Sequence, residues 1–98
     1  MLGNRMFFIT YHAEPNTGIQ NSEIGGAYIN CWIEAESIDQ AEQMARTKIE
    51  EENWTILDKE EAYEIQRSDY LENSNGLNYF DQALVDKLVL VFHTYPIH

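Results

Sequence analysis

The chain has 98 residues, of which 44% are hydrophobic and 12% aromatic, so it predicts one packed domain over residues 1–98 and leaves no room for a second. Its 17 acidic and 6 basic residues give a net charge of −11, which disfavours binding to nucleic acid or to anionic membranes and favours basic partners or cations. With one cysteine, no apolar stretch of about 20 residues and no signal-peptide pattern, the sequence predicts a cytoplasmic protein without disulfides or a membrane span.

The N-terminal part of the chain predicts two strands joined by a long connection. Residues 6–12, MFFITYH, are aromatic and β-branched, and residues 27–36 alternate between two kinds of side chain, so both ranges are typical of strands. Residues 13–26 between them are rich in Pro, Asn, Gly and Ser, and connections of this length are unusual in compact domains. We expect this connection either to be mobile or to fold over the sheet as a lid.

An amphipathic helix is predicted over residues 37–53, SIDQAEQMARTKIEEEN. Ser37 and Gln40 have the spacing of a capping box, and Asn53 suits a left-handed C-terminal stop. One apolar stripe recurs at helical spacing along the segment: Ala41, Met44, Ala45 and Ile49.

The C-terminal half predicts two more strands with a short helix between them. Residues 54–66 read as the third strand, bulged near Lys59, and Asn78 is expected to cap a helix over 79–87. Residues 88–95, LVLVFHTY, form the last strand, whose continuous apolar run predicts a central position in the sheet. The predicted fold class is therefore α+β, with a single four-stranded mixed or antiparallel sheet, two helices on one face and the element order ββαβαβ.

The stretch EAESIDQAEQMARTKIEEENWTIL, residues 34–57, resembles the strand–helix–strand core of small acidic bacterial proteins with ferredoxin-like or related α+β folds, many of unknown function. The resemblance covers about a quarter of the chain. It implies an α+β fold, although the predicted element order departs from the βαββαβ order of the ferredoxin-like fold. No catalytic residue carries over from it.

The second strand has two faces of different character. One is an apolar core face: Ile29, Cys31, Ile33 and Ala35. The other carries Tyr28, Asn30 and Trp32, and the first and last strands are also apolar on both faces. Since two helices on one side would leave the other side bare, we expect this aromatic face to be covered by residues 13–26, by a second subunit or by a ligand.

Motifs of enzymatic chemistry are missing from the sequence, which contains no nucleophile elbow, phosphate-binding loop or dinucleotide-binding motif. Cys31 is expected on the core face, where a thiol is a poor nucleophile. His12, Glu14 and His93 would form a metal or acid–base site only if the first and last strands were neighbours. We favour two unrelated histidines, and we predict no catalytic residue, no metal and no cofactor.

Two classes of function are open at this point. The favoured one is a non-catalytic interaction module that forms a homodimer through the open sheet face and binds a basic partner protein; Trp32→Arg would then give a folded monomer. The alternative is a small-molecule-binding protein or an enzyme with a pocket between that face and residues 13–26. In both, the expected ligand or interface residues are Tyr28, Asn30, Trp32 and His93.

Overall fold

Four strands and two α-helices make up the fold in the computed structural model, which describes residues 4–16 and 23–97. The elements follow one another along the chain as β1 (Arg5–Pro15), β2 (Ile24–Ala35), α1 (Ile38–Glu51), β3 (Trp54–Ile65), a 3-10 turn η1 (Arg67–Tyr70), α2 (Ser74–Asp86) and β4 (Leu88–Pro96). The predicted α+β class, the four-stranded sheet and the order ββαβαβ are confirmed. None of the helices in the described part of the chain has the length and apolar character needed to span a membrane.

The sheet is antiparallel throughout, and its strands lie in the order β3-β1-β2-β4. β4 is therefore an edge strand, and the prediction of a central position for it is wrong. Its apolar run has a different cause, because both of its faces are partly covered. Leu88, Leu90 and Phe92 pack on the α1 side, and Val89 and Val91 pack on the α2 side.

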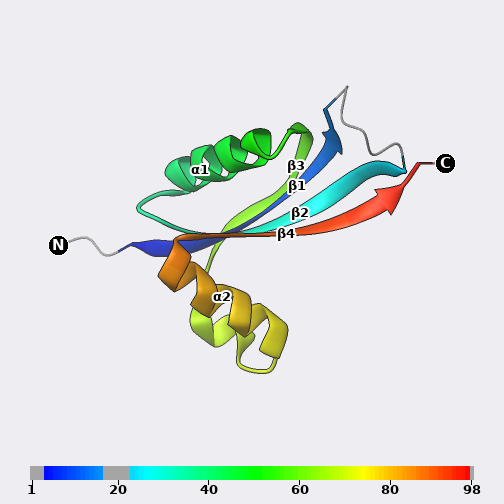
Figure 1. The fold of residues 1–98 in the computed structure, drawn as a ribbon. Helices are drawn as coiled ribbons and strands as arrows, with labels where there is room; N and C mark the ends of the chain where they lie inside the picture. The colour runs from blue at the N-terminus through cyan, green and yellow to red at the C-terminus, as the bar shows by residue number, and fades with distance from the viewer. Residues whose placement is uncertain (1–3, 17–22, 98) are drawn as a thin grey trace.

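The two helices lie on opposite faces of the sheet, with α1 above it and α2 below it in Figure 1. α1 packs Ala45 and Ile49 against one face, and α2 packs Phe80 and Ala83 against the other. The prediction of two helices on one face is therefore wrong. The physical reason is that the central strands carry large apolar side chains on both faces, so each face needs its own cover.

The ends of α1 use the predicted residues, although the Gln40 side chain bonds the backbone N–H of Glu36 rather than that of the Ser37 cap. The Ser37 hydroxyl accepts a hydrogen bond from the backbone N–H of Gln40 at 3.2 Å, and the Gln40 side chain accepts one from the backbone N–H of Glu36 at 2.7 Å. Asn53 has a φ of 71°, so the left-handed stop is confirmed. The bulge near Lys59 is confirmed as well, because the pairing of β1 with β3 shifts register between Thr10 and Tyr11.

α2 begins earlier than the sequence predicted. Its cap is Asn73 rather than Asn78, and the Asn73 side chain accepts a hydrogen bond from the backbone N–H of Gly76 at 2.9 Å. The polar run from Asn73 to Asn78 resembles a loop by composition. The Asn73 cap starts the helix within this run, and Gly76 lies so close to the ring of Tyr70 that a Cβ at this position would collide with the ring.

Candidate functional site

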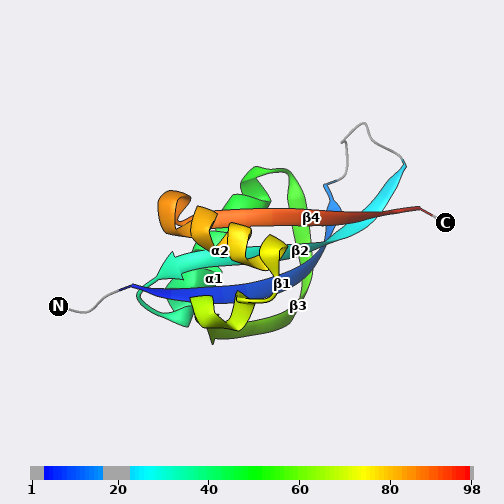
Figure 2. The ribbon, with the colours of Figure 1, turned by 90° about the horizontal axis from the view of Figure 1, so that it is seen from below.

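The α2-side face of the sheet is built from rows of side chains that run across the strands. The strand register places one aromatic row next to α2: Tyr63, Phe8, Trp32 and Val89. A mainly polar row follows: Glu61, Thr10, Asn30 and Val91. A third row lies farther along the strands: Asp58, His12, Tyr28 and His93. In Figure 2, α2 crosses only part of this face, and the strands continue uncovered beyond it.

We call the uncovered part the open half-face. It comprises the partly or fully exposed residues around the buried Thr10: His12, Tyr28, Asn30, Asp58, Glu61, His93 and Tyr95. Its polar side chains bind one another sideways: the Thr10 hydroxyl donates to the side-chain oxygen of Asn30 at 3.1 Å, and the Asn30 amide nitrogen lies 3.4 Å from Nε2 of His93. Such lateral pairing holds Asn30 and His93 in place while both keep solvent contact.

The outer end of the open half-face is aromatic. The ring of Tyr28 stacks on the ring of His12 with the centroids 4.6 Å apart, and Nε2 of His12 lies 2.6 Å from the hydroxyl of Tyr95. Gly26 makes this arrangement possible, because a Cβ there would collide with the Tyr95 hydroxyl. Tyr28 is nevertheless 44% exposed, so this cluster presents aromatic surface to the solvent.

A groove of about 520 Å³ lies where the open half-face meets α2 and η1. The sheet supplies six of its lining residues: Phe8, Asn30, Trp32, Glu61, Tyr63 and His93. η1 and α2 supply the opposite side with Tyr70, Asn73, Asn75, Gly76 and Tyr79. Aromatic rings and neutral hydrogen-bonding groups therefore make up most of its surface, which is the composition of many ligand-binding sites.

The rings of the groove form a connected series. The ring centroid of Phe8 lies 5.6 Å from that of Tyr63 and 5.1 Å from that of Trp32, and the ring of Trp32 lies 4.8 Å from that of Tyr79. The indole N–H of Trp32 donates to the hydroxyl of Tyr70 at 3.2 Å. These contacts fix the rings relative to one another, so the groove is largely preformed.

The groove has negative electrostatic character near Tyr63. Burial raises the pKa of the Tyr63 hydroxyl, and the nearby carboxylate of Glu61 and, to a smaller extent, that of Asp69 raise it further. Glu61 is the one fully charged side chain among the described residues that line the groove, and no ion pair joins it to another described residue. Its charge is therefore available to a ligand.

The structure divides the predicted ligand residues. Asn30, Trp32 and His93 line the groove, whereas Tyr28 lies outside it against His12. The described residues opposite the sheet come from η1, α2 and its cap Asn73. Of the connection predicted over residues 13–26, residues 13–15 belong to β1, residues 24–26 belong to β2, and residues 17–22 lie outside the described residues.

Trp32 is covered from within the chain. It is 5% exposed and lies beneath Tyr79 of α2, so it does not offer the bare aromatic surface that the sequence suggested. Trp32→Arg would bury an unpaired charge in the packing of α2, and it would unfold or loosen the domain instead of giving a folded monomer. The burial of Trp32 therefore contradicts the expectation that Trp32→Arg gives a folded monomer.

The candidate metal residues do not meet. β2 separates β1 from β4, so Tyr28 stands between His12 and His93 in the third row, and Glu14 pairs with Thr55 at the other edge. Across residues 4–16 and 23–97, no group of three His, Cys, Asp or Glu side chains is placed to hold a metal ion.

Cys31 lies on the α1 side and is fully buried among the core residues. Burial raises the pKa of its thiol to about 12, so the thiolate is scarce at neutral pH. The thiol therefore has neither the access nor the ionisation that a nucleophile requires.

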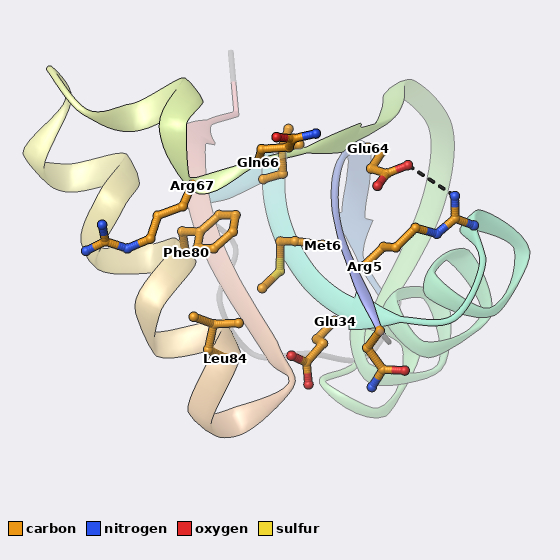
Figure 3. A pocket seen from close by; sticks show the side chains of 10 residues that line it. Arg5, Met6, Glu34, Glu64, Gln66, Arg67, Phe80 and Leu84 are labelled. Carbon is orange, nitrogen blue, oxygen red and sulfur yellow. Dashed lines mark hydrogen bonds and ion pairs between the residues drawn. The ribbon is translucent and has the colours of Figure 1, made fainter. Parts of the chain in front are cut away.

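A second hollow of about 300 Å³ lies at the other end of α2, with Met6, Phe80 and Leu84 pointing into it (Figure 3). Its charged groups are already engaged. Arg5 pairs with Glu64 at 3.1 Å, and two further pairs join Arg67 to Asp81 and Lys87 to Glu34. A charged ligand would have to break such pairs, so the groove is the stronger candidate site.

Comparisons of the chain with models of protein families, with curated proteins and with solved structures find no match. The site is therefore interpreted from its own geometry. The resemblance of residues 34–57 to small acidic bacterial proteins stays a prediction.

Proposed function

We propose that the protein is a non-catalytic binding module of the cytoplasm that recognises a basic partner protein through the open half-face and the adjoining groove. One observation carries the proposal. Beside the half of the face that α2 covers, lateral contacts hold three side chains that remain partly or fully exposed: His12, Tyr28 and Asn30. Residues with aromatic rings and hydrogen-bonding ends are enriched where proteins bind other molecules.

The charges of the chain support a basic partner. Five of the six basic side chains pair with carboxylates: Arg5, Lys48, Lys59, Arg67 and Lys87. The sixth, Arg46, lies over the ring of Tyr11 at 5.4 Å from its centroid. The chain's own cations are therefore engaged, and the net charge of −11 remains to attract a partner of opposite charge.

The chemistry of the site supports binding without catalysis. The thiol of Cys31 lies on the other side of the sheet, and the described contacts of His12 and His93 are with Tyr and Asn side chains. A histidine that acts as a general base is usually oriented by a carboxylate and placed beside a nucleophile. Neither histidine has that arrangement within the described residues.

The homodimer expected from the sequence would now use a different surface. Because α2 covers the aromatic row, a second copy that packed on this side of the sheet would meet the open half-face, which is more polar than the aromatic row. Two chains of charge −11 also repel each other. We therefore propose that a basic partner binds the open half-face. A homodimer through this surface would contradict the proposal.

A small-molecule-binding protein is the second candidate, and the groove is the observation that favours it. Its volume of about 520 Å³ falls in the range of roughly 300–1,000 Å³ that is common for small-ligand sites. The groove and the open half-face share Asn30, Glu61 and His93, so both candidates use one continuous surface.

The proposal is tested by titrating a basic peptide, acetyl-Lys-Arg-Lys-Arg-Lys-Arg-amide, into ¹⁵N-labelled protein at near-physiological salt. We expect the largest changes in chemical shift at the amides of Thr10, Asn30 and Glu61, because the peptide should lie across the strands along the polar row that these residues form. Tyr28→Ala should weaken binding, and Gln43→Ala on the exposed side of α1 is the matched control.

Two results would overturn the proposal. In the first, the shift changes spread over the acidic C-terminal end of α1 and spare the open half-face, which would indicate attraction by charge alone. In the second, light scattering shows a dimer at micromolar concentration that Tyr28→Arg dissociates, so that a second copy occupies the surface.

A further inference from the structure

The composition of the groove points to one chemical class of ligand. Five aromatic side chains line it, together with the carboxylate of Glu61, and neither lysine nor arginine is found among its described lining residues. Aromatic faces carry negative electrostatic potential and attract cations, most strongly where water is partly excluded. A carboxylate beside such rings adds a full charge of the same sign and a hydrogen-bond acceptor.

We infer that the groove binds a single cationic group, a guanidinium or an alkylammonium. Its charge would lie beside the carboxylate of Glu61, and the group would contact the aromatic rings of Tyr63 and Phe8. This inference rests on the proposed function and specifies which group of the ligand the groove selects. Tyr63 is 46% exposed and belongs to the same ring series as Phe8, so a ligand reaches it from solvent.

The neutral groups of the groove fit a planar cation with several donors. The side-chain oxygen of Asn30 accepts from Thr10 at 3.1 Å, and a carbonyl-type oxygen has a second lone pair to offer. Across the groove, the Tyr70 hydroxyl accepts from the indole of Trp32. A guanidinium carries five N–H donors in one plane and matches such spaced acceptors better than a compact ammonium does.

The N-terminus of α2 also faces the groove, and its partial positive charge opposes a cation. This charge is about half of an elementary charge, and the Asn73 side chain already satisfies the backbone N–H of Gly76. The full charge of Glu61 outweighs it. The elevated pKa of Tyr63, to which Glu61 and Asp69 contribute, is consistent with a net negative potential on that side.

The chain carries its own reporter for the groove. The indole N–H of Trp32 is bonded to Tyr70 inside the site, whereas Trp54 packs against Phe92 in the core cluster on the α1 side of the sheet. The two indole signals of a ¹⁵N spectrum therefore report on the two faces, and a Trp54→Phe variant identifies which signal is which.

The test compares N-acetyl-arginine amide with N-acetyl-citrulline amide, which has nearly the same shape and no charge. We expect the arginine derivative to shift the Trp32 signal at millimolar concentration and to leave the Trp54 signal in place. The citrulline derivative should bind at least about fivefold more weakly, the factor that corresponds to about 1 kcal/mol.

Two pairs of variants separate charge from ring. Glu61→Gln should weaken binding of the arginine derivative by about fivefold, and Glu60→Gln, at the neighbouring position with the same loss of charge, should not. Tyr63→Leu should weaken binding, and Tyr63→Phe should retain it because it keeps the aromatic ring.

The outcomes distinguish this inference from the proposed function. Equal binding of both derivatives in the groove would overturn the cation inference and leave the binding module standing. If neither derivative binds while the basic hexapeptide still maps to the open half-face, the inference is likewise overturned and the proposed function survives.

Two further probes, acetyl-Gly-Gly-Arg-Gly-Gly-amide and ethylguanidinium, test whether the cation belongs to a protein partner or to a free small molecule. Their affinities for the groove are compared. Binding of the peptide at least as tightly as ethylguanidinium supports an arginine side chain of a partner, because the peptide backbone can also reach the open half-face. Exclusion of the peptide with retention of ethylguanidinium supports a free small molecule and overturns the partner as its source.

Discussion

The two faces of the sheet use the same strands for different purposes. On the α1 side, the side chains of the central strands are apolar from end to end, and Ile9, Ile29 and Ile33 are completely buried. On the α2 side, the cover stops after the aromatic row. In the remaining rows Thr10 is buried, whereas Tyr28, Glu61 and His93 are exposed. One face thus supplies a continuous core, and the other supplies a partial core together with a candidate site.

The comparison shows how a small domain can stabilise itself and still present a binding surface. Because neighbouring residues of a strand point to opposite faces, every strand residue that contributes to the α1-side core leaves its neighbour free for the other side. The α1-side core therefore stabilises the strands that carry the open half-face. The side chains of the open half-face are then less constrained by packing and can serve binding.

The largest effect that would test this division is expected from two neighbouring residues of β2. Ile29→Ala should lower the free energy of unfolding by about 3 kcal/mol, because it leaves a cavity in a fully buried core. Tyr28→Ala, on the open half-face, should lower it by less than about 1 kcal/mol. Urea denaturation measures both, and equal losses would show that the open half-face is structural.

A smaller effect is expected where α2 meets the sheet. Gly76→Ala should cost about 2 kcal/mol, because the added Cβ displaces the Tyr70 ring and weakens its hydrogen bond from Trp32. Asn75→Ala, its exposed neighbour, is the control and should cost less. The Trp32 indole signal should move more in the first variant than in the second. An unchanged signal with unchanged stability would mean that α2 accommodates the added Cβ without displacing the Tyr70 ring.

The smallest effect is a pH dependence of the free energy of unfolding, which is expected from Cys31 in the α1-side core. The pKa of Cys31 rises from 9.0 to about 12 in the folded chain, so burial of the neutral thiol contributes stability that is complete below pH 9 and is lost as the pH rises toward 12. Between pH 8 and pH 10, the wild type should lose about 1.4 kcal/mol more than Cys31→Val. Urea denaturation at both pH values measures the difference, and parallel losses would place the thiol in contact with solvent.

Part of the candidate site could be foreseen from single residues. Asn30, Trp32 and His93 were predicted as ligand residues because aromatic and polar side chains alternated with a core face on the second strand, and they do line the groove. Tyr70 and Tyr79 were missed. The helical spacing of Tyr79, Phe80 and Ala83 was a usable signal, since it gives α2 an aromatic face suited to an aromatic row.

By itself, the sequence determined the features that depend on neighbours along the chain. These are the four strands, the apolar face of β2, the Ser37 cap, the left-handed Asn53 and the bulge near Lys59, because side-chain period, capping and turn chemistry act over a few residues. Only the tertiary structure decided the strand order and the face to which α2 docks. Those choices depend on the path of the chain after β3 and on long-range pairing, and they brought Glu61, Tyr63 and Tyr79 together in one groove.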